Sequence, residues 1–181
     1  MTLNKKGIIN TLISIIIMSI LIVFDQFTKK LAVAHLMNKE PYRIIDGVFE
    51  LRYLENRGAA FGMMQNQKII FVIIAAIMLL AVLYFLYNIP SDKKYIIFRI
   101  CMILIGAGAV GNLIDRLSQS FVVDFLYFIL IDFPIFNVAD IYVSVSCVIL
   151  VVCVLFYYKE EDFNFLKLFQ LQTFCAFNMN H

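Results

Sequence analysis

Residues 69–87 read "IIFVIIAAIMLLAVLYFLY", a run in which no side chain carries a charge. A helix needs about 20 apolar residues to cross the hydrocarbon core of a bilayer, so this run has the length of a transmembrane helix. Strands buried in a soluble core are much shorter, typically about 4–8 residues. The fold is therefore expected to be set by the number of such spans.

Three further segments have similar length and character, namely residues 7–24, 95–114 and 138–158. Arg99 lies near the start of its segment, where a long cationic side chain can reach the membrane interface. The 181-residue chain is 62% hydrophobic and 15% charged, whereas soluble domains contain about 45–50% apolar residues. We predict an all-α polytopic membrane protein with four transmembrane helices.

The amino-terminal segment also resembles a secretory signal. Lys5 and Lys6 precede an apolar run, and "AVA" at residues 32–34 resembles a cleavage site. However, the run 7–24 is longer than a usual signal core, and "DQFTKK" separates it from the small residues. We therefore expect a retained spanning helix.

The composition argues against several other classes of protein. The net charge is +2 and basic residues do not alternate with aromatic ones, so no nucleic-acid partner is expected. The four cysteines form no CxxC pair and are read as small apolar residues. Neither His35 nor His181 lies near a cysteine or a second histidine at ligand spacing, so we predict no metal and no cofactor.

The long polar loop, about residues 28–68, has a pattern of its own. Residues 48–54 alternate polar and apolar side chains, which indicates a strand, and Asp46-Gly47 is a turn signal before it. We predict a small β-sheet on the membrane face, between the first and second helices. The small residues that follow, Gly58 and Ala60 among them, permit close backbone approach.

Four crossings place the unusual polar residues on one face of the membrane. The end of the first span, the long loop, the end of the third span and the start of the fourth all emerge there. The polar residues on this face are Asp25, Lys29, Asn56, Asn112, Arg116, Asp124, Asn137 and Asp140. A functional site is therefore expected at one end of the bundle, and loop charges alone do not decide which side of the membrane it faces.

Three carboxylates punctuate the apolar stretch 122–140, "VVDFLYFILIDFPIFNVAD". Asp124 and Asp140 lie at facing helix mouths, where two carboxylates close together share one proton and can act as general acid and base. Helix-end capping or ion pairing with Arg116 is the structural alternative for both. Asp132 precedes Phe133-Pro134 and is read as a turn residue.

The remaining polar residues have structural explanations as well. Asp25 and Lys29 have the i, i+4 spacing of a helical ion pair, and the neighbours Asp115 and Arg116 are candidates for another. Asn112 and Asn137 are suited either to orienting a carboxylate or peptide or to interhelical hydrogen bonding. The run 106–111, "GAGAVG", favours close helix packing.

Five blocks together resemble the bacterial lipoprotein signal peptidase family, signal peptidase II. They are "DQFTK" (25–29), "ENRGAAFG" (55–62), "GAVGNLIDR" (108–116), "FVVDF" (121–125) and "FNVAD" (136–140), in register over about residues 8–158. The family usually has two adjacent glycines in the third block. Here Ala107 replaces the first, which should crowd the helix contact only slightly.

The resemblance implies an aspartyl endopeptidase that cuts prolipoproteins just before a cysteine carrying diacylglyceryl. It implies that Asp124 and Asp140 are the catalytic pair. Substrate-binding positions would be Asn56, Asn112, Arg116 and Asn137. Structural support would come from Asp25, Lys29, Gly58, Ala60, Phe61 and Gly108. Residues 1–158 would form one membrane peptidase domain, followed by a cytoplasmic tail at 159–181.

The resemblance also implies a place in the cell. The protein would lie in the bacterial plasma membrane, in contact with lipid, with cytoplasmic termini and an active site on the extracytoplasmic face. Sensitivity to the cyclic peptide globomycin is implied too, and we expect a monomer.

Two rival functions explain less of the sequence. Intramembrane aspartyl proteases of the presenilin or prepilin-peptidase kind carry a GxGD motif, but "GAG" at 106–108 is followed by Ala109. A proton-coupled transporter would place carboxylates near the middle of the bilayer, ideally in repeated halves. A membrane scaffold accounts for the hydrophobicity but not for the convergence of Asp and Asn.

Overall fold

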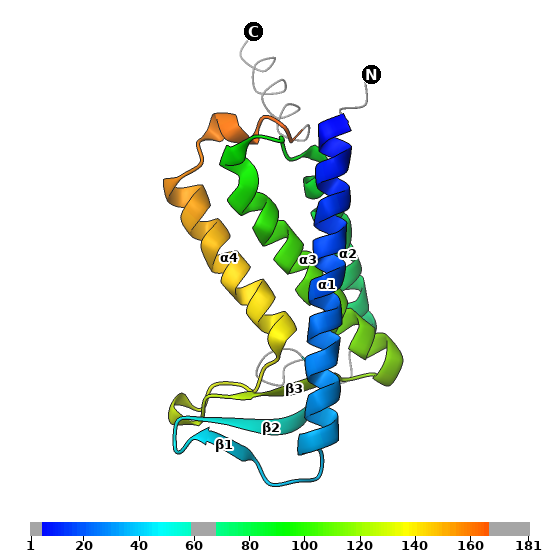
Figure 1. The fold of residues 1–181 in the computed structure, drawn as a ribbon, viewed down its shortest axis with the longest axis vertical. Helices are drawn as coiled ribbons and strands as arrows, with labels where there is room; N and C mark the ends of the chain where they lie inside the picture. The colour runs from blue at the N-terminus through cyan, green and yellow to red at the C-terminus, as the bar shows by residue number, and fades with distance from the viewer. Residues whose placement is uncertain (1–4, 59–67, 167–181) are drawn as a thin grey trace.

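The computed structural model describes residues 5–58 and 68–166 and shows a helical bundle closed at one end by a small sheet (Figure 1). The helices are α1 (Lys5–Leu36), α2 (Lys68–Asn88), α3 (Ile96–Gln119) and α4 (Val138–Phe156). The strands are β1 (Tyr42–Ile45), β2 (Phe49–Asn56) and β3 (Val122–Tyr127). Short 3₁₀ helices are η2 (Lys93–Tyr95), η3 (Ile129–Ile131) and η4 (Glu160–Phe163).

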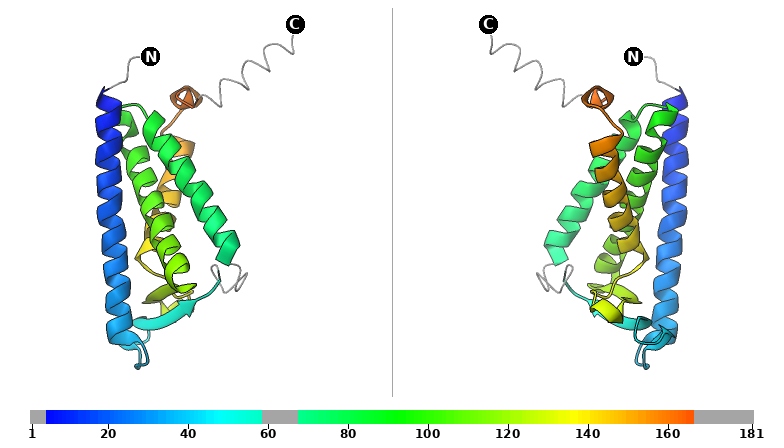
Figure 2. Two further views of the ribbon diagram at one scale, coloured as in Figure 1. Left: turned by 90° about the vertical axis from the view of Figure 1, so that its right-hand side faces the viewer. Right: turned by 90° about the vertical axis from the view of Figure 1, so that its left-hand side faces the viewer.

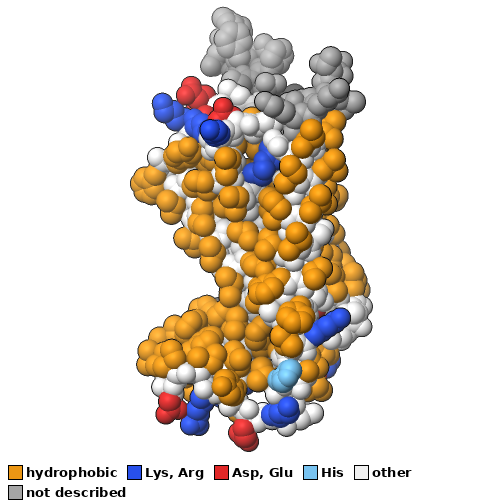
Figure 3. Space-filling model, viewed as in Figure 1, with side chains coloured by type: hydrophobic (Ala, Val, Ile, Leu, Met, Phe, Trp, Pro, Cys, Tyr) orange, Lys and Arg blue, Asp and Glu red, His pale blue; other side chains and the backbone are white. Residues whose placement is uncertain are grey.

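The surface of the bundle is that of a multi-pass membrane protein. Each of the four α-helices is long and apolar enough to cross a bilayer. Figure 3 shows hydrophobic side chains over the middle of the molecule and charged side chains gathered toward its two ends. This arrangement matches a bilayer in which lipid covers the middle and water reaches both ends.

Helix α1 extends further than its predicted span. The span was expected to end at residue 24, but the helix continues through Asp25 and Lys29 to Leu36. The two charged side chains form an ion pair 2.9 Å long within the helix. Because the charges neutralise each other inside the protein, they do not end the helix.

Helix α3 lies at the centre and packs against the other three helices (Figure 2). The run of small residues makes these contacts close. A Cβ atom added at Gly108 would lie 2.5 Å from the backbone oxygen of Ala139 in α4, and one added at Gly111 would lie 2.5 Å from Asp25 Oδ2 in α1. Backbone of α4 and a side chain of α1 therefore touch α3 where a larger residue would not fit.

The predicted sheet between the first two helices is present, and it includes a strand from outside that loop. Its order is β1-β2-β3 with antiparallel pairing, and β3 comes from the connection between α3 and α4. The β-branched Val122 and Val123 favour a strand there. Leu54 pairs with Asp124 and Asn56 with Val122, so the sheet carries Asp124 next to the end of β2.

At the opposite end of the bundle, the chain after α4 folds back onto α3. Lys94 forms an ion pair of 2.6 Å with Asp162, and the Tyr158 hydroxyl donates to the Lys94 carbonyl oxygen at 3.1 Å. The rings of Tyr158, Phe163 and Phe165 pack around Phe98, and the Tyr95 ring stacks on Tyr158. Residues 159–166 thus belong to the packed structure.

Candidate active site

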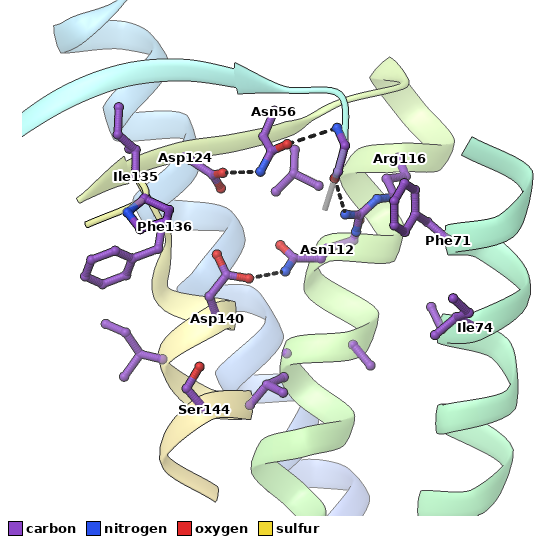
Figure 4. A pocket seen from close by; sticks show the side chains of 18 of the residues that line it. Asn56, Phe71, Ile74, Asn112, Arg116, Asp124, Ile135, Phe136, Asp140 and Ser144 are labelled. Carbon is purple, nitrogen blue, oxygen red and sulfur yellow. Dashed lines mark hydrogen bonds between the residues drawn. The ribbon is translucent and has the colours of Figure 1, made fainter. Parts of the chain in front are cut away.

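Asp124 lies on β3 with its side chain turned into the protein, 1% exposed. Asn56 Nδ2 donates to Asp124 Oδ2 at 2.8 Å (Figure 4). Asn137 Nδ2 donates to Asp124 Oδ1 at 2.6 Å. The first bond follows from sheet register. Asp124 pairs with Leu54, and Asn56, two residues further along β2, projects from the same face.

Burial, followed by the negative charge of Asp140, raises the pKa of Asp124 to about 7. The hydrogen bonds from Asn56 and Asn137 and the charge of Lys29 act in the opposite direction. Desolvation of the carboxylate is the larger effect. This carboxyl group therefore holds a proton at pH values where an ordinary aspartate has lost it.

Asp140 lies in the first turn of α4, where the helix begins with a capping box. The backbone N–H of Asn137 donates to Asp140 Oδ2 at 3.0 Å, and the backbone N–H of Asp140 donates to Asn137 Oδ1 at 3.0 Å. From α3, Asn112 Nδ2 donates to Asp140 Oδ1 at 2.8 Å. Both oxygens of Asp140 are thus held by fixed donors, one of them backbone.

Asn137 joins the two aspartates. Its side chain is fully buried, and Nδ2 donates both to Asp124 and to Asn112 Oδ1, the latter at 3.2 Å. An isolated bridge between Leu126 and Phe136 ties the end of the connection back to β3. This bridge brings the start of α4 beside Asp124, although α4 begins well after β3 in the chain.

A buried ion cluster of α1 and α3 lies behind the aspartates. Lys29 Nζ lies 2.9 Å from Asp25 Oδ2 and 2.9 Å from Asp115 Oδ2, and the lysine side chain is 3% exposed. Gln26 Nε2 donates to Asp115 Oδ1 at 2.9 Å, and Asp25 Oδ1 accepts from the backbone N–H of Ala139 at 3.0 Å. The predicted pair of Asp25 and Lys29 is present, but Asp115 pairs with Lys29 and not with its neighbour Arg116.

Arg116 points into the site without a carboxylate partner among residues 5–58 and 68–166. Its Nη2 donates to the Gly58 carbonyl oxygen at 3.3 Å, and its guanidinium lies 4.7 Å from the centre of the Phe71 ring. The alternative that Asp124 and Asp140 are explained by ion pairs with Arg116 is therefore wrong. Asp140 does take part in capping α4 together with Asn137, and it also accepts a hydrogen bond from Asn112.

These side chains line a cavity of about 620 Å³ between α2, α3, α4 and the sheet. The polar wall is formed by the two aspartates with Asn56, Asn112 and Arg116. The opposite walls are apolar: Phe71, Ile74 and Met78 of α2, Val143 and Val145 of α4, and residues 133–136. Figure 4 shows Asp124, Asn112 and Asp140 facing this space and Phe71 and Ile74 across it. An apolar cavity with a few convergent polar groups is typical of a ligand site.

Several residues named from the sequence lie elsewhere. Asp132 is exposed, accepts a hydrogen bond from Tyr127 at 2.5 Å and does not line the cavity. It adopts a left-handed conformation (φ 48°) at the end of η3, in agreement with a turn residue. Ala60 and Phe61 lie outside the described residues.

The sequence analysis assigned no site role to Asp115, Gln26 or Phe71. Asp115 and Gln26 lie inside the "GNLIDR" and "DQFTK" blocks, so block membership was a usable signal for both. Phe71 sits in the charge-free run 69–87, where nothing distinguishes it from its neighbours. Only the crossing of α2 and α3 shows that its ring faces Arg116.

The described residues contain no group of three or more histidine, cysteine or acidic side chains placed to hold a metal ion. The chemistry that the cavity supports with its own residues is acid–base chemistry. The raised pKa of Asp124, about 7, lets this group hold and release a proton close to neutral pH, and a second carboxylate is linked to it through one asparagine. Such a pair can activate water and protonate a carbonyl oxygen.

Comparisons with known proteins identify the family of the chain. The family model described as "Signal peptidase (SPase) II" matches residues 17–156. The chain is 44% identical over 147 residues to the lipoprotein signal peptidase of Clostridioides difficile, covering 81% of this chain and 97% of the relative. It is 42% identical over 142 residues to that of Streptococcus thermophilus, covering 78% and 90%. Among solved structures, a bacterial membrane enzyme determined in meso at 2.3 Å matches with a TM-score of 0.70 and 32% identity, covering 81% of this chain and 92% of that one.

Proposed function

The chain belongs to the signal peptidase II family of aspartic-type peptidases, and on that premise we propose that it removes signal peptides from diacylglyceryl-modified prolipoproteins. In this proposal the scissile bond is the peptide bond just before the lipid-modified cysteine. The observation that carries the proposal is the convergence of Asp124 and Asp140 on one cavity, joined by Asn137.

The proposed mechanism uses the two aspartates as general base and general acid. One carboxylate removes a proton from water as the water attacks the carbonyl carbon, and the other carboxyl group donates a proton to the carbonyl oxygen. No covalent intermediate forms. Asn56, Asn112 and Asn137 hold the carboxyl groups in place, so the pair requires little reorganisation during the reaction.

The shape of the cavity suits a lipidated substrate. Its polar wall lies at the sheet end of the bundle, where water and the membrane interface meet, while its apolar walls run along α2 and α4 toward the middle of the span. A lipidated cysteine has its acyl chains in the bilayer and its peptide near the interface. We further propose that Arg116 binds substrate, because its guanidinium has no carboxylate partner among the described residues and lines the cavity.

The test is cleavage of a diacylglyceryl-modified prolipoprotein peptide by purified protein in detergent. We expect Asp124→Asn and Asp140→Asn to lose about 10³-fold or more of kcat while remaining folded. Asp132→Asn is the matched control and should cut normally, since Asp132 is exposed outside the cavity. Near-normal turnover by either of the first two variants would exclude the aspartyl mechanism.

Two parallel reactions test the substrate and the inhibitor. The same peptide without diacylglyceryl should be cut poorly, and globomycin should inhibit wild type. Equal cleavage of both peptides would mean that the apolar walls do not select for lipid.

The proposal also places the protein in the bacterial plasma membrane with cytoplasmic termini. Reporter fusions at residue 40 and at the carboxyl terminus should therefore report opposite sides of the membrane.

A further inference from the structure

Lys29 is linked to the aspartate pair by hydrogen bonds through one side chain, that of Asn112. Besides its two ion pairs, Lys29 Nζ lies 2.8 Å from Asn112 Oδ1. An ammonium group can only donate hydrogen bonds, so the Asn112 atom that faces it must be the carbonyl oxygen. The amide nitrogen of Asn112 must then point the other way, which is toward Asp140 at 2.8 Å.

The same oxygen serves a second partner. Asn112 Oδ1 also accepts from Asn137 Nδ2 at 3.2 Å, and Asn137 Nδ2 in turn donates to Asp124. If Asn112 were reversed, its amide nitrogen would face both Lys29 and Asn137, which offer only hydrogen-bond donors at these positions. The lysine therefore fixes the direction of the hydrogen bond from Asn112 to Asp140. The orientation of Asn137 is fixed separately, because its Oδ1 accepts from the backbone N–H of Asp140.

The two aspartates receive different donors as a result. Asp140 accepts from an amide polarised by the Lys29 cation and from a backbone N–H at the start of α4, where the helix dipole favours negative charge. Asp124 lies on a strand, is 1% exposed and accepts only from the carboxamides of Asn56 and Asn137. The donors around Asp140 therefore stabilise an ionised carboxylate more than those around Asp124 do, so that of the two groups Asp124 is the one that holds the shared proton.

Among the described residues, the other charged side chains near the two aspartates come from α1 and α3. From α1 they are Asp25 and Lys29, which pair with each other, and from α3 they are Asp115, paired with Lys29, and Arg116. Arg116 Nη2 is held by the Gly58 carbonyl oxygen at 3.3 Å, and no ion pair joins it to either aspartate. Lys29 is therefore the cation that is coupled to Asp140 through a continuous hydrogen-bonded path.

We propose that Lys29 is a positioning residue of the peptidase: through Asn112 it holds Asp140 as the ionised base, so that the single proton of the pair rests on Asp124. This assignment of roles rests on the proposed function, whereas the position of the proton does not. Asp140 then takes a proton from water while the resulting hydroxide attacks the carbonyl carbon. Asp124 gives its proton to the carbonyl oxygen, which yields a gem-diol.

Collapse of the gem-diol restores both groups. Protonated Asp140 donates to the leaving nitrogen as the C–N bond breaks, and Asp124 takes a proton from one of the hydroxyls as the carbonyl reforms. The products are a carboxylic acid and a free amine, and the pair again carries one proton on Asp124. No additional acid, base or metal is needed for the balance.

The direct test is a pH titration of protein labelled with ¹³C at aspartate Cγ, followed by NMR in detergent without substrate. The Asp124 and Asp140 signals are assigned by single Asn substitutions. We expect acidification to protonate Asp124 first. Protonation of Asp140 first would overturn the assignment, even if the enzyme cleaves prolipoproteins as proposed.

The role of Lys29 is tested by Lys29→Met, with Lys30→Met at the adjacent exposed position as control. We expect proton uptake by Asp140 to move up by about one pH unit, together with the acidic limb of the kcat/KM profile. We also expect kcat to fall about 10- to 100-fold with little change in KM. The control should match wild type.

An unchanged titration order and pH profile in folded Lys29→Met would refute the positioning role. Because that variant leaves Asp25 and Asp115 without their cation, a charge-balanced double variant, Asp25→Asn with Lys29→Met, provides a second version of the test. It keeps the net charge of the cluster, and an amide oxygen at position 25 can still accept from the Ala139 N–H. The same upward shift for Asp140 is expected, and its absence would count equally against the proposal.

Discussion

The two ends of the bundle each hold a lysine–aspartate pair, and the two pairs differ in burial and in the number of partners that they share. Lys29 lies 2.9 Å from Asp25 with the side chains 3% and 0% exposed, whereas Lys94 lies 2.6 Å from Asp162 with the side chains 36% and 10% exposed. The first pair shares its lysine with Asp115 and with the active-site asparagine Asn112. The shorter distance is thus found in the pair that is less buried and less connected.

Different forces hold the two ends together. At the far end, the rings around Phe98 fill the space between α3 and the chain after α4, and the ion pair lies at the margin of this aromatic cluster. At the site end, polar groups occupy the interior, and each must be satisfied by another. An ion-pair distance by itself therefore says little about importance, which depends on burial and on the number of shared partners.

Removing a member of the buried cluster should have the largest effect. Asp25→Ala leaves Lys29 with one carboxylate fewer and leaves the Ala139 N–H without its acceptor. We expect a loss of about 3–5 kcal/mol in the free energy of unfolding, measured by denaturant titration in detergent. Asp162→Ala at the far end is the control, and equal losses in the two variants would remove the distinction between the ends.

Filling the small-residue contact should have the next largest effect, and two glycines of α3 provide a matched pair. A Cβ at Gly108 would meet the Ala139 backbone oxygen at 2.5 Å, whereas one at Gly106 would meet the flexible Met18 side chain at 2.5 Å. We expect Gly108→Ala to cost about 1–3 kcal/mol and to lower activity, because α4 must move. Gly106→Ala should cost less, and the reverse order would show that backbone contact does not govern this crossing.

The buried carboxyl group should make stability depend on pH. The pKa of Asp124 is raised to about 7 in the folded protein from its ordinary value of 3.8. Between these values the folded state keeps a proton that the unfolded state has lost, so this group's contribution to stability falls as pH rises from about 4 to about 7. We expect the Tm of Asp124→Asn, relative to wild type, to increase from about pH 5 to about pH 8. A Tm difference that is constant over this range would contradict the raised pKa.

The smallest effect is expected at the far end. Lys94→Met removes the partly exposed pair but leaves the aromatic cluster intact. Such pairs contribute little, so we expect a Tm within about 2 °C of wild type and normal cleavage. Phe98→Ala, at the centre of the rings, should lower the Tm clearly more than Lys94→Met. A larger drop in Tm for Lys94→Met than for Phe98→Ala would show that the ion pair, and not the aromatic cluster, stabilises this end.

The fold could be predicted from the sequence where one physical requirement acts alone. The apolar runs need a bilayer, which is sufficient to predict four helices and the end of the bundle at which the polar residues meet. The third strand was missed because Val122–Tyr127 is too short to be distinguished from a connection, and its pairing with β2 involves residues far apart in the chain. The continuation of α1 to Leu36 was missed because residues from about 28 onward were read as part of the polar loop, although Asp25 and Lys29 had the spacing of a helical ion pair.

The site could be predicted only in part. The convergence of Asp124 and Asp140 on one cavity agrees with the expectation from their spacing, and the family resemblance supplied their expected roles. The expected ion-pair partner of Asp115 was wrong. Local spacing favoured Arg116, whereas the actual partner is Lys29 on another helix. The orientation of Asn112 depends on three contacts from three segments, and no local pattern in the sequence contains it.

The position of Asn137 has a consequence for the order in which the protein assembles in the membrane. The buried side chain of Asn137 caps the start of α4 and donates to Asn112 of α3 and to Asp124 of β3. The site is therefore complete only when the last span has docked. A chain caught partway through membrane insertion has its aspartates on separate, unjoined segments. A newly made chain is therefore expected to gain peptidase activity only after α4 has docked against α3 and the sheet.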